Sequence, residues 1–459
     1  MGIFNFFKRG KGKMTGYKDI SEALSAYGIN CAMSEEMEQA ISLWRDIYQN
    51  KPSWKKSGDV YSLNLGKSIS QELQTLTMSE FSASIDNDDY LNSVLQEKII
   101  APLYSNLEKA LAVGGCIFKP YSDGKTISVD MVLQGDFIPV KFDNDGNIID
   151  IIFVDQYYEG DTLFTKLERQ NLDRENNKVI VSNIAFKGEK DKLGKRITLA
   201  ETSKWKDLEE TAEIDNVDHA LYGIFKCPMS NNIDFNSPLG VSVFNSATEV
   251  MQRADEQFSR LDWEYEGGQL AIDVDSDAFK GDLDQTKCRL YRQCDIGNDG
   301  DTYHAFAPAL RSNDYRNGLN FYLTQIENLC GLARGTLCEA QIEARTATEI
   351  KISRQNTYIT VHSIQKALEL ALNDVIRAIY DFGRLYSLTN KTEMDYNIDF
   401  GDSVLTDMRE EIEIRMMLVN AGAIGKAELR KWYTGETDDE AKAKVKEIAD
   451  EDKITFNEV

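Results

Sequence analysis

A helical pattern of about 40 residues, from Thr346 to about Tyr386, constrains this chain more than any other feature of its sequence. Thr346-Ala347-Thr348-Glu349 fits a capping box, in which the Thr346 hydroxyl and the Glu349 carboxylate satisfy backbone amides at the helix start. Such a helix would be roughly 60 Å long, a length typical of elongated assembly subunits rather than compact enzymes. Its apolar positions keep helical spacing throughout, at Val361, Ile364, Leu368, Ala371, Val375, Ile379 and Phe382.

A second long helical pattern, of about 29 residues, follows Ser237-Pro238 and ends at Gly267-Gly268. Proline in the first turn and glycine after the last turn is the usual asymmetry of a helix. Residues 269–311 then have a mixed, strand-containing pattern, and a helical pattern returns over 312–330. A long helix, a small β-containing insertion and a returning helix predict a stem with a tip.

The remaining sequence makes the predicted fold class α+β, and 459 residues are too many for one ordinary core. Over 115–200 the apolar period changes to two, and Asp123-Gly124 and Asp145-Gly146 predict hairpins in an antiparallel meander. Pro102 is expected to kink or break the helix that contains it. Three helices are expected before the meander and three in the tail, over 34–50, 68–79 and 90–113, then 409–419, 425–432 and 438–450.

The charge balance limits the partners that this chain can have. Its net charge of −24 excludes non-specific coating of nucleic acid and disfavours an anionic membrane surface. The longest uncharged apolar run, 110–118, is far too short to span a membrane, and the N-terminus fits no secretory signal. The seven cysteines are odd in number and scattered, so reduced thiols are expected. We therefore expect a protein that is assembled inside a cell, with no membrane partner.

Few residues offer catalytic chemistry. There is no Walker A loop, because Tyr61 and Lys119 stand where the two Gly-Lys-Ser/Thr endings require a first glycine. The chain has three histidines, and the spacing of Cys288 and Cys294 near His304 is wider than zinc sites usually show. The sequence thus predicts no enzyme and no cofactor.

One acidic loop keeps a metal-dependent enzyme as the alternative hypothesis. Asp273, Asp275 and Asp277 resemble the start of a calcium loop, with Asp284 at the twelfth position. The sixth position is Ala278 instead of glycine, so a solvated acidic loop is the simpler interpretation of 273–284.

Several short strings, together with the order of the elements, resemble the portal proteins of tailed bacteriophages, in the branch found in phages of Gram-positive bacteria. RTATEI is the most specific of them, because it lies at the capped start of a very long helix after a loop. The strings are SLNLGKSISQEL (62–73), ALAVGGCIFKPY (110–121), SPLGVSVFNSATEV (237–250), ARTATEI (344–350) and GETDDEAKAKVKEIADE (435–451).

This resemblance implies an elongated portal fold, with long helices, an antiparallel β-rich wing, stem helices and a small α/β clip around a central channel. Such proteins normally form a ring of twelve chains. By position, the implied segments are a basic N-terminal segment (1–33), the wing (34–237), a stem helix (238–268), the clip (269–311), a stem helix (312–330), a tunnel loop (331–345), the long wing helix and return (346–402) and the crown (403–459).

The resemblance also implies a function. The ring would occupy one capsid vertex of the virion and conduct double-stranded DNA during packaging and ejection. It would dock the packaging motor (terminase) and connect the capsid to head-completion and tail adaptor proteins. The tunnel loop would face DNA with Gly331, Arg334, Gly335, Gln341, Glu343 and Arg345.

Two features of these segments have simpler explanations that stay open at this point. An acidic stem would keep phosphates from sticking as DNA slides, but surface solubility explains acidic residues equally well. Residues 331–345 could be an ordinary connection between helices, although about 15 residues is long for that role. The acidic stem residues are Glu249, Asp255, Glu256 and Asp262.

Overall fold

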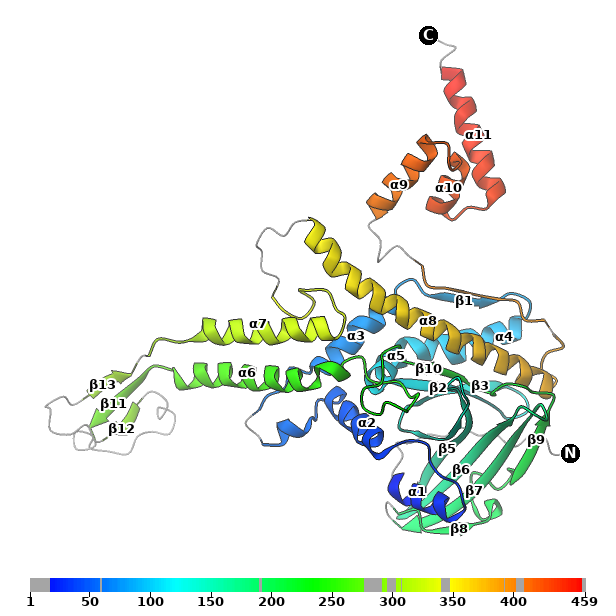
Figure 1. Cartoon of the computed structure of the whole chain (residues 1–459), viewed down its shortest axis with the longest axis horizontal. Helices are drawn as coiled ribbons and strands as arrows, with labels where there is room; N and C mark the ends of the chain where they lie inside the picture. The colour runs from blue at the N-terminus through cyan, green and yellow to red at the C-terminus, as the bar shows by residue number, and fades with distance from the viewer. Residues whose placement is uncertain are drawn as a thin grey trace. The chain divides into compact units, whose positions relative to one another are not determined.

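The protein is described from a computed structural model of the whole chain, shown in Figure 1. The chain divides into two compact units, Met1–Met78 with Ser82–Ile398, and Ser79–Phe81 with Asp399–Val459. The described residues are 17–57, 60–189, 192–275, 291–294, 303–306, 308–339, 347–391, 393–401 and 408–455.

The first unit begins with helices that bury one apolar face each. The expected cap of α2 (Glu35–Tyr48) is confirmed, because the Ser34 hydroxyl accepts a hydrogen bond from the Met37 amide at 3.4 Å. Met37, Ile41, Trp44 and Ile47 form the buried face of α2. The sequence pattern missed α1 (Tyr17–Ala26) and placed the start of α3 (Leu65–Met78) three residues late.

Pro102 does not break the predicted third helix, which contains a π-helical turn just before it. The chain runs from α4 (Asp89–Val94) through a π-helical turn, η2 (Leu95–Ile100), into α5 (Ala101–Val113). The Ala101 amide donates to the Gln96 carbonyl, five residues back, which is the π-helical bond. Proline occupies the first turn of α5, where its missing N–H costs least.

The predicted single meander is wrong in one respect, because its strands form two sheets. The chain leaves the first sheet at Gly135, whose φ of +92° is left-handed, and Arg45 then binds the Asp136 carboxylate at 3.0 Å. The first sheet has the order β10-β2-β3, from Gly223–Lys226, Gly115–Ser122 and Ile127–Leu133. The second has the order β4-β5-β6-β7-β8, with β9 on β7, from Phe137–Phe142, Ile148–Glu159, Thr162–Asp173, Lys178–Glu189, Lys195–Ile197 and Thr211–Asp215.

The hairpins predicted at Asp123-Gly124 and Asp145-Gly146 are confirmed, since they join β2 to β3 and β4 to β5 in antiparallel pairs. Together with the helices, these sheets confirm the α+β fold class.

A cluster of charged side chains is buried where strands of the two sheets approach each other. Glu168 on β6 is fully buried and accepts from Lys119 of β2 at 2.7 Å and from Lys166 at 3.0 Å. Asp155 accepts from the indole of Trp205 at 2.9 Å. These residues, Trp205 excepted, line a cavity of about 540 Å³. Two lysines and two carboxylates thus share one poorly hydrated site.

The predicted helix over 238–266 is shorter than expected. α6 spans Thr248–Gly267, which is 20 residues, and the chain before it is not α-helical. Backbone groups there bond to the body of the first unit instead, as Val243 donates to the Leu111 carbonyl at 3.1 Å and Gly240 accepts from the Gln134 side chain at 2.8 Å. Because those groups are already satisfied, the helix does not extend toward Pro238.

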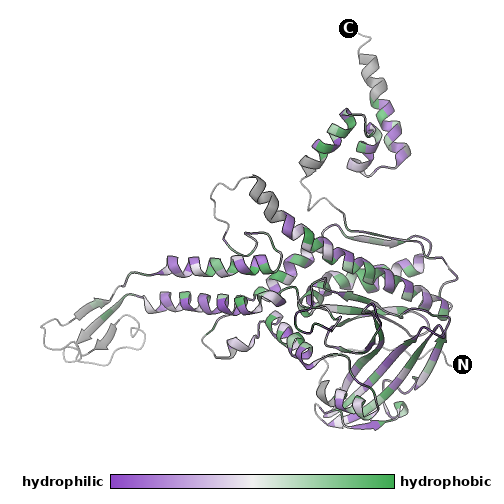
Figure 2. Cartoon of the chain, in the orientation of Figure 1, coloured by the Kyte–Doolittle hydropathy of each residue, from purple (hydrophilic) through white to green (hydrophobic). Residues whose placement is uncertain are grey.

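α6 and α7 (Ser312–Leu329) run side by side, with a three-stranded sheet at the end of the pair (Figure 1). Figure 2 shows that both helices are predominantly hydrophilic. The strands are β11 (Ala271–Asp275), β12 (Tyr291–Cys294) and β13 (Tyr303–Phe306). β11 pairs with β12 in parallel and with β13 antiparallel. The helix over 312–330 and the strands between the helices confirm the pattern predicted for 269–330.

The long helix is confirmed as α8, Ala347–Leu385, with 39 residues. All seven positions of its predicted apolar stripe are buried. β10 lies so close to it that a Cβ at Gly223 would come within 2.2 Å of the Ala371 carbonyl oxygen. A two-stranded sheet of β1 (Ser82–Ile85) and β14 (Tyr396–Asp399) was not predicted.

The second unit has three helices in its described residues, α9 (Met408–Asn420), α10 (Lys426–Thr434) and α11 (Asp438–Thr455), as the tail pattern predicted.

Candidate functional site

The loop that follows α7 begins with a tight helix cap. The Leu332 amide donates to the Glu327 carbonyl at 2.8 Å and the Gly331 amide to the Asn328 carbonyl at 3.4 Å, which is the Schellman pattern. Gly331 has a φ of +67°, and a Cβ there would lie 2.2 Å from the Thr360 hydroxyl of α8. That hydroxyl donates to the Gly331 carbonyl at 3.3 Å. Gly331, predicted as part of a DNA-facing loop, therefore ends α7 against α8.

The carboxylate of Glu327 holds the next residues of the loop. Glu327 is fully buried, and one oxygen accepts the backbone amides of Gly335, Leu337 and Cys338 at 3.1, 2.6 and 3.0 Å. Its second oxygen accepts from the Cys338 thiol at 3.2 Å. Charge-assisted bonds to three amides make a concave amide cluster around one buried anion. Burial, and secondarily Glu327, raises the pKa of the Cys338 thiol.

The charges of the loop are partly balanced by α7. Arg316 binds both carboxylate oxygens of Glu339, at 2.8 and 2.9 Å, and lowers the pKa of Glu339. Arg334 lines a hollow of about 360 Å³ beside α7, together with Asn320 and Phe321. With Glu339 paired to Arg316, the described part of the loop presents Arg334 as its basic side chain.

Four of the predicted site residues, Gln341, Glu343, Arg345 and Thr346, lie outside the described residues. Glu349 lies in the first turn of α8, but its side chain is also outside the described part of the chain. The capping box therefore stays a prediction.

Asp255, predicted as part of an acidic stem surface, is instead buried at the base of α6. Its carboxylate accepts from the Trp54 indole and from the Leu63 amide, both at 2.9 Å. Only 2% of the residue is exposed, and burial raises the pKa of its carboxyl. Asp255 thus fastens α6 to the segment between α2 and α3.

The other acidic residues of α6 differ in their exposure and in their partners. Glu249 is exposed, Asp262 is half-buried, and Glu256 pairs with Arg253 of the same helix at 3.0 Å. Glu264 is buried and accepts from the amide and guanidinium of Arg311, at 3.0 and 2.7 Å. A buried carboxylate therefore lies near each end of α6. Asp255 ties the helix to the body of the first unit, and Glu264 ties it to Arg311 at the start of α7.

The described residues contain neither a grouped set of metal ligands nor a membrane-spanning helix. Among them, no three histidine, cysteine or acidic side chains are grouped as a metal site would need. Asp273 and Asp275 lie on β11, while Asp277 and Asp284 fall outside the described part of the chain. No helix in the described ranges combines the length and the apolarity needed to cross a membrane.

Sequence reasoning missed Glu327 as a functional residue of the loop. The signal was present, because Leu323, Ile326, Glu327 and Cys330 follow the i, i+3, i+4, i+7 spacing of a buried helix face. An acidic residue in such a stripe needs partners, and the nearby loop supplies them.

Residues 80–455 match the family described as phage portal protein, SPP1 Gp6-like. The match covers most of the chain, so this protein belongs to that family of phage portal proteins. A search of curated proteins found no match. Proteins of this family are structural and in general non-enzymatic, and they form oligomeric rings at a capsid vertex. The alternative hypothesis of a metal-dependent enzyme is not supported by this match.

Proposed function

We propose that twelve copies of this chain form a ring that conducts double-stranded DNA into and out of the capsid, docks the terminase and connects to head-completion and tail adaptor proteins. The observation that carries the proposal is the α6–α7 pair, with Asp255 at its base, Glu264–Arg311 near its tip and β11–β13 beyond. The ring is assembled in the host cytoplasm and becomes part of the virion. No catalytic step is assigned to it.

The proposal also assigns a role to each segment of the chain. In this proposal the helices and sheets over 34–237 and α8 are the wing, α6 and α7 are the stem, 269–311 is the clip, 331–345 is the tunnel loop and 403–459 is the crown. Exposed aromatic side chains on the stem favour lateral contacts between copies, since Trp263 is 66% exposed and Phe321 is 61% exposed.

Native mass spectrometry and negative-stain microscopy test the ring directly. The expected result is a closed species of twelve chains with a central hole. Trp263→Asp should weaken the ring by placing a charge in the stem contact, whereas Glu266→Gln on the same helix should leave it intact. A wild-type chain that stays monomeric at micromolar concentration and physiological salt would contradict the proposal.

The tunnel loop is proposed to touch DNA through Arg334 and Arg345. Arg334→Glu should impair DNA packaging or retention while ring assembly and terminase docking persist, because it reverses one phosphate-facing charge. Removing one arginine–phosphate interaction should also flatten the salt dependence of DNA binding by about one unit of slope. Wild-type packaging and retention by Arg334→Glu/Arg345→Glu rings would contradict the role of these charges.

The clip is proposed as the docking site for terminase, and later for the tail adaptor. Replacing 269–311 with a short Gly-Ser linker should abolish terminase capture in a pull-down. The wing should keep its fold by circular dichroism. Retained capture would refute the assignment.

Thr346 and Glu349 are proposed as a helix cap with no catalytic part. Thr346→Ala should lower the free energy of unfolding by about 1 kcal/mol. Thr346→Ser keeps the hydroxyl, so assembled Thr346→Ser rings should package normally. Loss of packaging in such rings would show that capping is not the role of Thr346.

A further inference from the structure

The three helices of the second unit bury almost no side chains among themselves. Among the described side chains of α9, α10 and α11, only Ala441 is buried. α9, α10 and α11 span 48 residues, a size at which a single chain rarely buries enough apolar area to fold unaided. These helices therefore need a partner surface.

α9 has two apolar faces, and one of them faces solvent. Ile412, Arg415 and Val419 are half-buried toward α10, where Arg415 lies over the Trp432 ring at 4.2 Å. The opposite stripe, called here the outer stripe, has i, i+3, i+4 spacing. Its residues Ile414, Met417 and Leu418 are 51%, 66% and 39% exposed. Figure 2 shows the apolar residues of α9.

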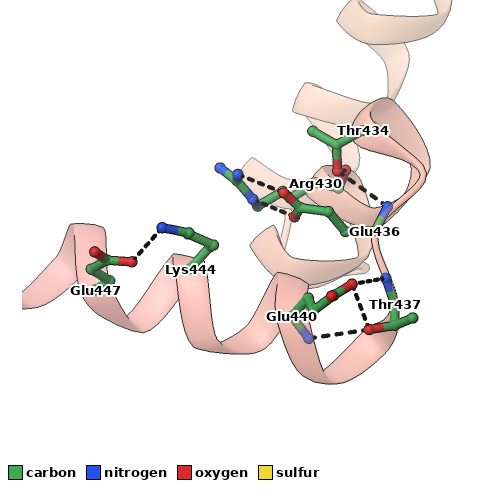
Figure 3. Close-up of polar contacts among 7 residues, drawn as sticks. All are labelled: Arg430, Thr434, Glu436, Thr437, Glu440, Lys444 and Glu447. Atoms are coloured by element: carbon green, nitrogen blue, oxygen red, sulfur yellow. Dashed lines mark hydrogen bonds and ion pairs between the residues drawn. The ribbon is translucent and has the colours of Figure 1, made fainter.

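The chemistry of this unit fits a protein partner better than DNA. Residues 408–455 contain nine basic and twelve acidic side chains, a net charge of −3. Several basic groups are already held by carboxylates of the same unit, as Figure 3 shows for Arg430 with Glu436 and Lys444 with Glu447. Phosphate binding needs free positive charge, whereas a stripe of Ile, Met and Leu needs an apolar surface.

In the proposed ring, the protein partner nearest to hand for the outer stripe is the second unit of the neighbouring copy. Head-to-tail contacts in a closed ring join two different patches of each chain. α11 carries a second apolar patch. Its residues Ala441, Val445 and Ile448 lie on one face of the helix, and Ile448 is 48% exposed. α10 packs on α11, and Thr437 and Glu440 cap the start of α11 reciprocally (Figure 3).

We propose that the outer stripe of α9 in one copy packs on the Ile448 end of α11 in the neighbouring copy, so that the second unit is stabilised by ring assembly. This inference rests on the proposed ring. The ring itself does not require it, because contacts between the first units of neighbouring copies could close the ring alone.

Cysteine cross-linking of the full chain tests the contact. Met417→Cys/Ile448→Cys should form a ladder of disulfide-linked species under mild oxidation, since each copy then carries both halves of the contact. Each single variant, and the wild-type chain with its seven native cysteines, should give no such ladder. Rings visible by microscopy without a ladder would overturn the contact and leave the proposed function standing. Dimers from Met417→Cys alone would also overturn it, because they would indicate a two-fold contact.

Hydrogen exchange within assembled rings provides a second test. Met417→Glu should speed amide exchange over 408–455 by about tenfold or more, the factor expected for losing one buried side chain of this size. Met416→Glu is the matched control, because Met416 is 52% exposed on the same helix but lies off the outer stripe. Equal exchange in the two variants would overturn the proposal.

Discussion

The sheets of the first unit and the helices of the second contain the same kind of ion pair in opposite settings. Lys166 and Glu168 bond at 3.0 Å with side chains 1% and 0% exposed, whereas Lys444 and Glu447 bond at 2.8 Å with side chains 53% and 56% exposed. A buried pair has lost its hydration, so removing one partner leaves an uncompensated charge. An exposed pair simply exchanges its bond for water. Two ion pairs with nearly equal nitrogen–oxygen distances are therefore expected to differ greatly in the stability that is lost when one partner is removed.

Glu327 belongs with the buried group, although its partners are backbone amides instead of lysines. It lies at 0% exposure and holds three amides of the loop. The first unit thus uses buried carboxylates to fix strands and a loop. The described ion pairs of the second unit are exposed or, in the case of Arg430 with Glu436, half-buried.

The largest expected effect is that of Glu168→Ala. It leaves two buried lysines, Lys119 and Lys166, with Asp155 as the one remaining carboxylate of the cluster, so the free energy of unfolding should fall by about 3–5 kcal/mol. Urea denaturation measures this loss, and Glu447→Ala, the same substitution at an exposed pair, is the control. A loss as small as that of Glu447→Ala would remove the distinction between the two regions.

Acid should weaken the same cluster. Burial by itself would raise the pKa of Glu168, but Lys119 and Lys166 outweigh burial and lower that pKa from 4.5 to about 2. The folded pKa is below the unfolded one, so this stabilisation is present above about pH 4.5 and is lost as the pH falls toward 2.

The difference in unfolding free energy between wild type and Glu168→Gln, measured at each pH, isolates this contribution. It should shrink by about 3 kcal/mol between pH 6 and pH 2. A difference that does not depend on pH would show that Glu168 is not ionised in the folded protein.

Glu327→Ala should act next most strongly, and its effect should be local. The amides of Gly335, Leu337 and Cys338 would lose their common acceptor, at a cost of about 1–3 kcal/mol. Hydrogen exchange at these three amides should accelerate, while exchange in α8 stays unchanged. Glu339→Gln is the control, because Glu339 is exposed and bonds to Arg316. Unchanged exchange in Glu327→Ala would show that the carboxylate does not order the loop.

Helices were the part of the fold that the sequence predicted best. α7, α8 and the three tail helices have continuous apolar spacing or clear caps, and such local signals survive in the folded chain. The length of α6 was overestimated, because its first predicted turns bond to distant groups such as the Leu111 carbonyl. The family was predicted correctly from the order of elements and the short strings.

Sheet partners and buried charges were not predictable in the same way. Strands β2 to β8 share one alternating pattern, so the division into two sheets depends on distant contacts such as Arg45 with Asp136. Lys166 and Glu168 occupy alternate positions that an exposed strand face would also give to charged residues. Only their burial beneath Lys119 of another sheet makes them structural.

Lys444→Ala should have the smallest effect of all. The Lys444–Glu447 pair is exposed and spans one helical turn, so water replaces its bond at little cost. Thermal unfolding of the full chain should therefore be unchanged within error, at low and at high salt. The result sharpens the comparison, because Met417→Glu on α9 of the same unit is expected to speed amide exchange over 408–455 in assembled rings, whereas Lys444→Ala is not. If Lys444→Ala destabilised the second unit as much as Met417→Glu, its ion pairs, and not an apolar contact between copies, would hold it together.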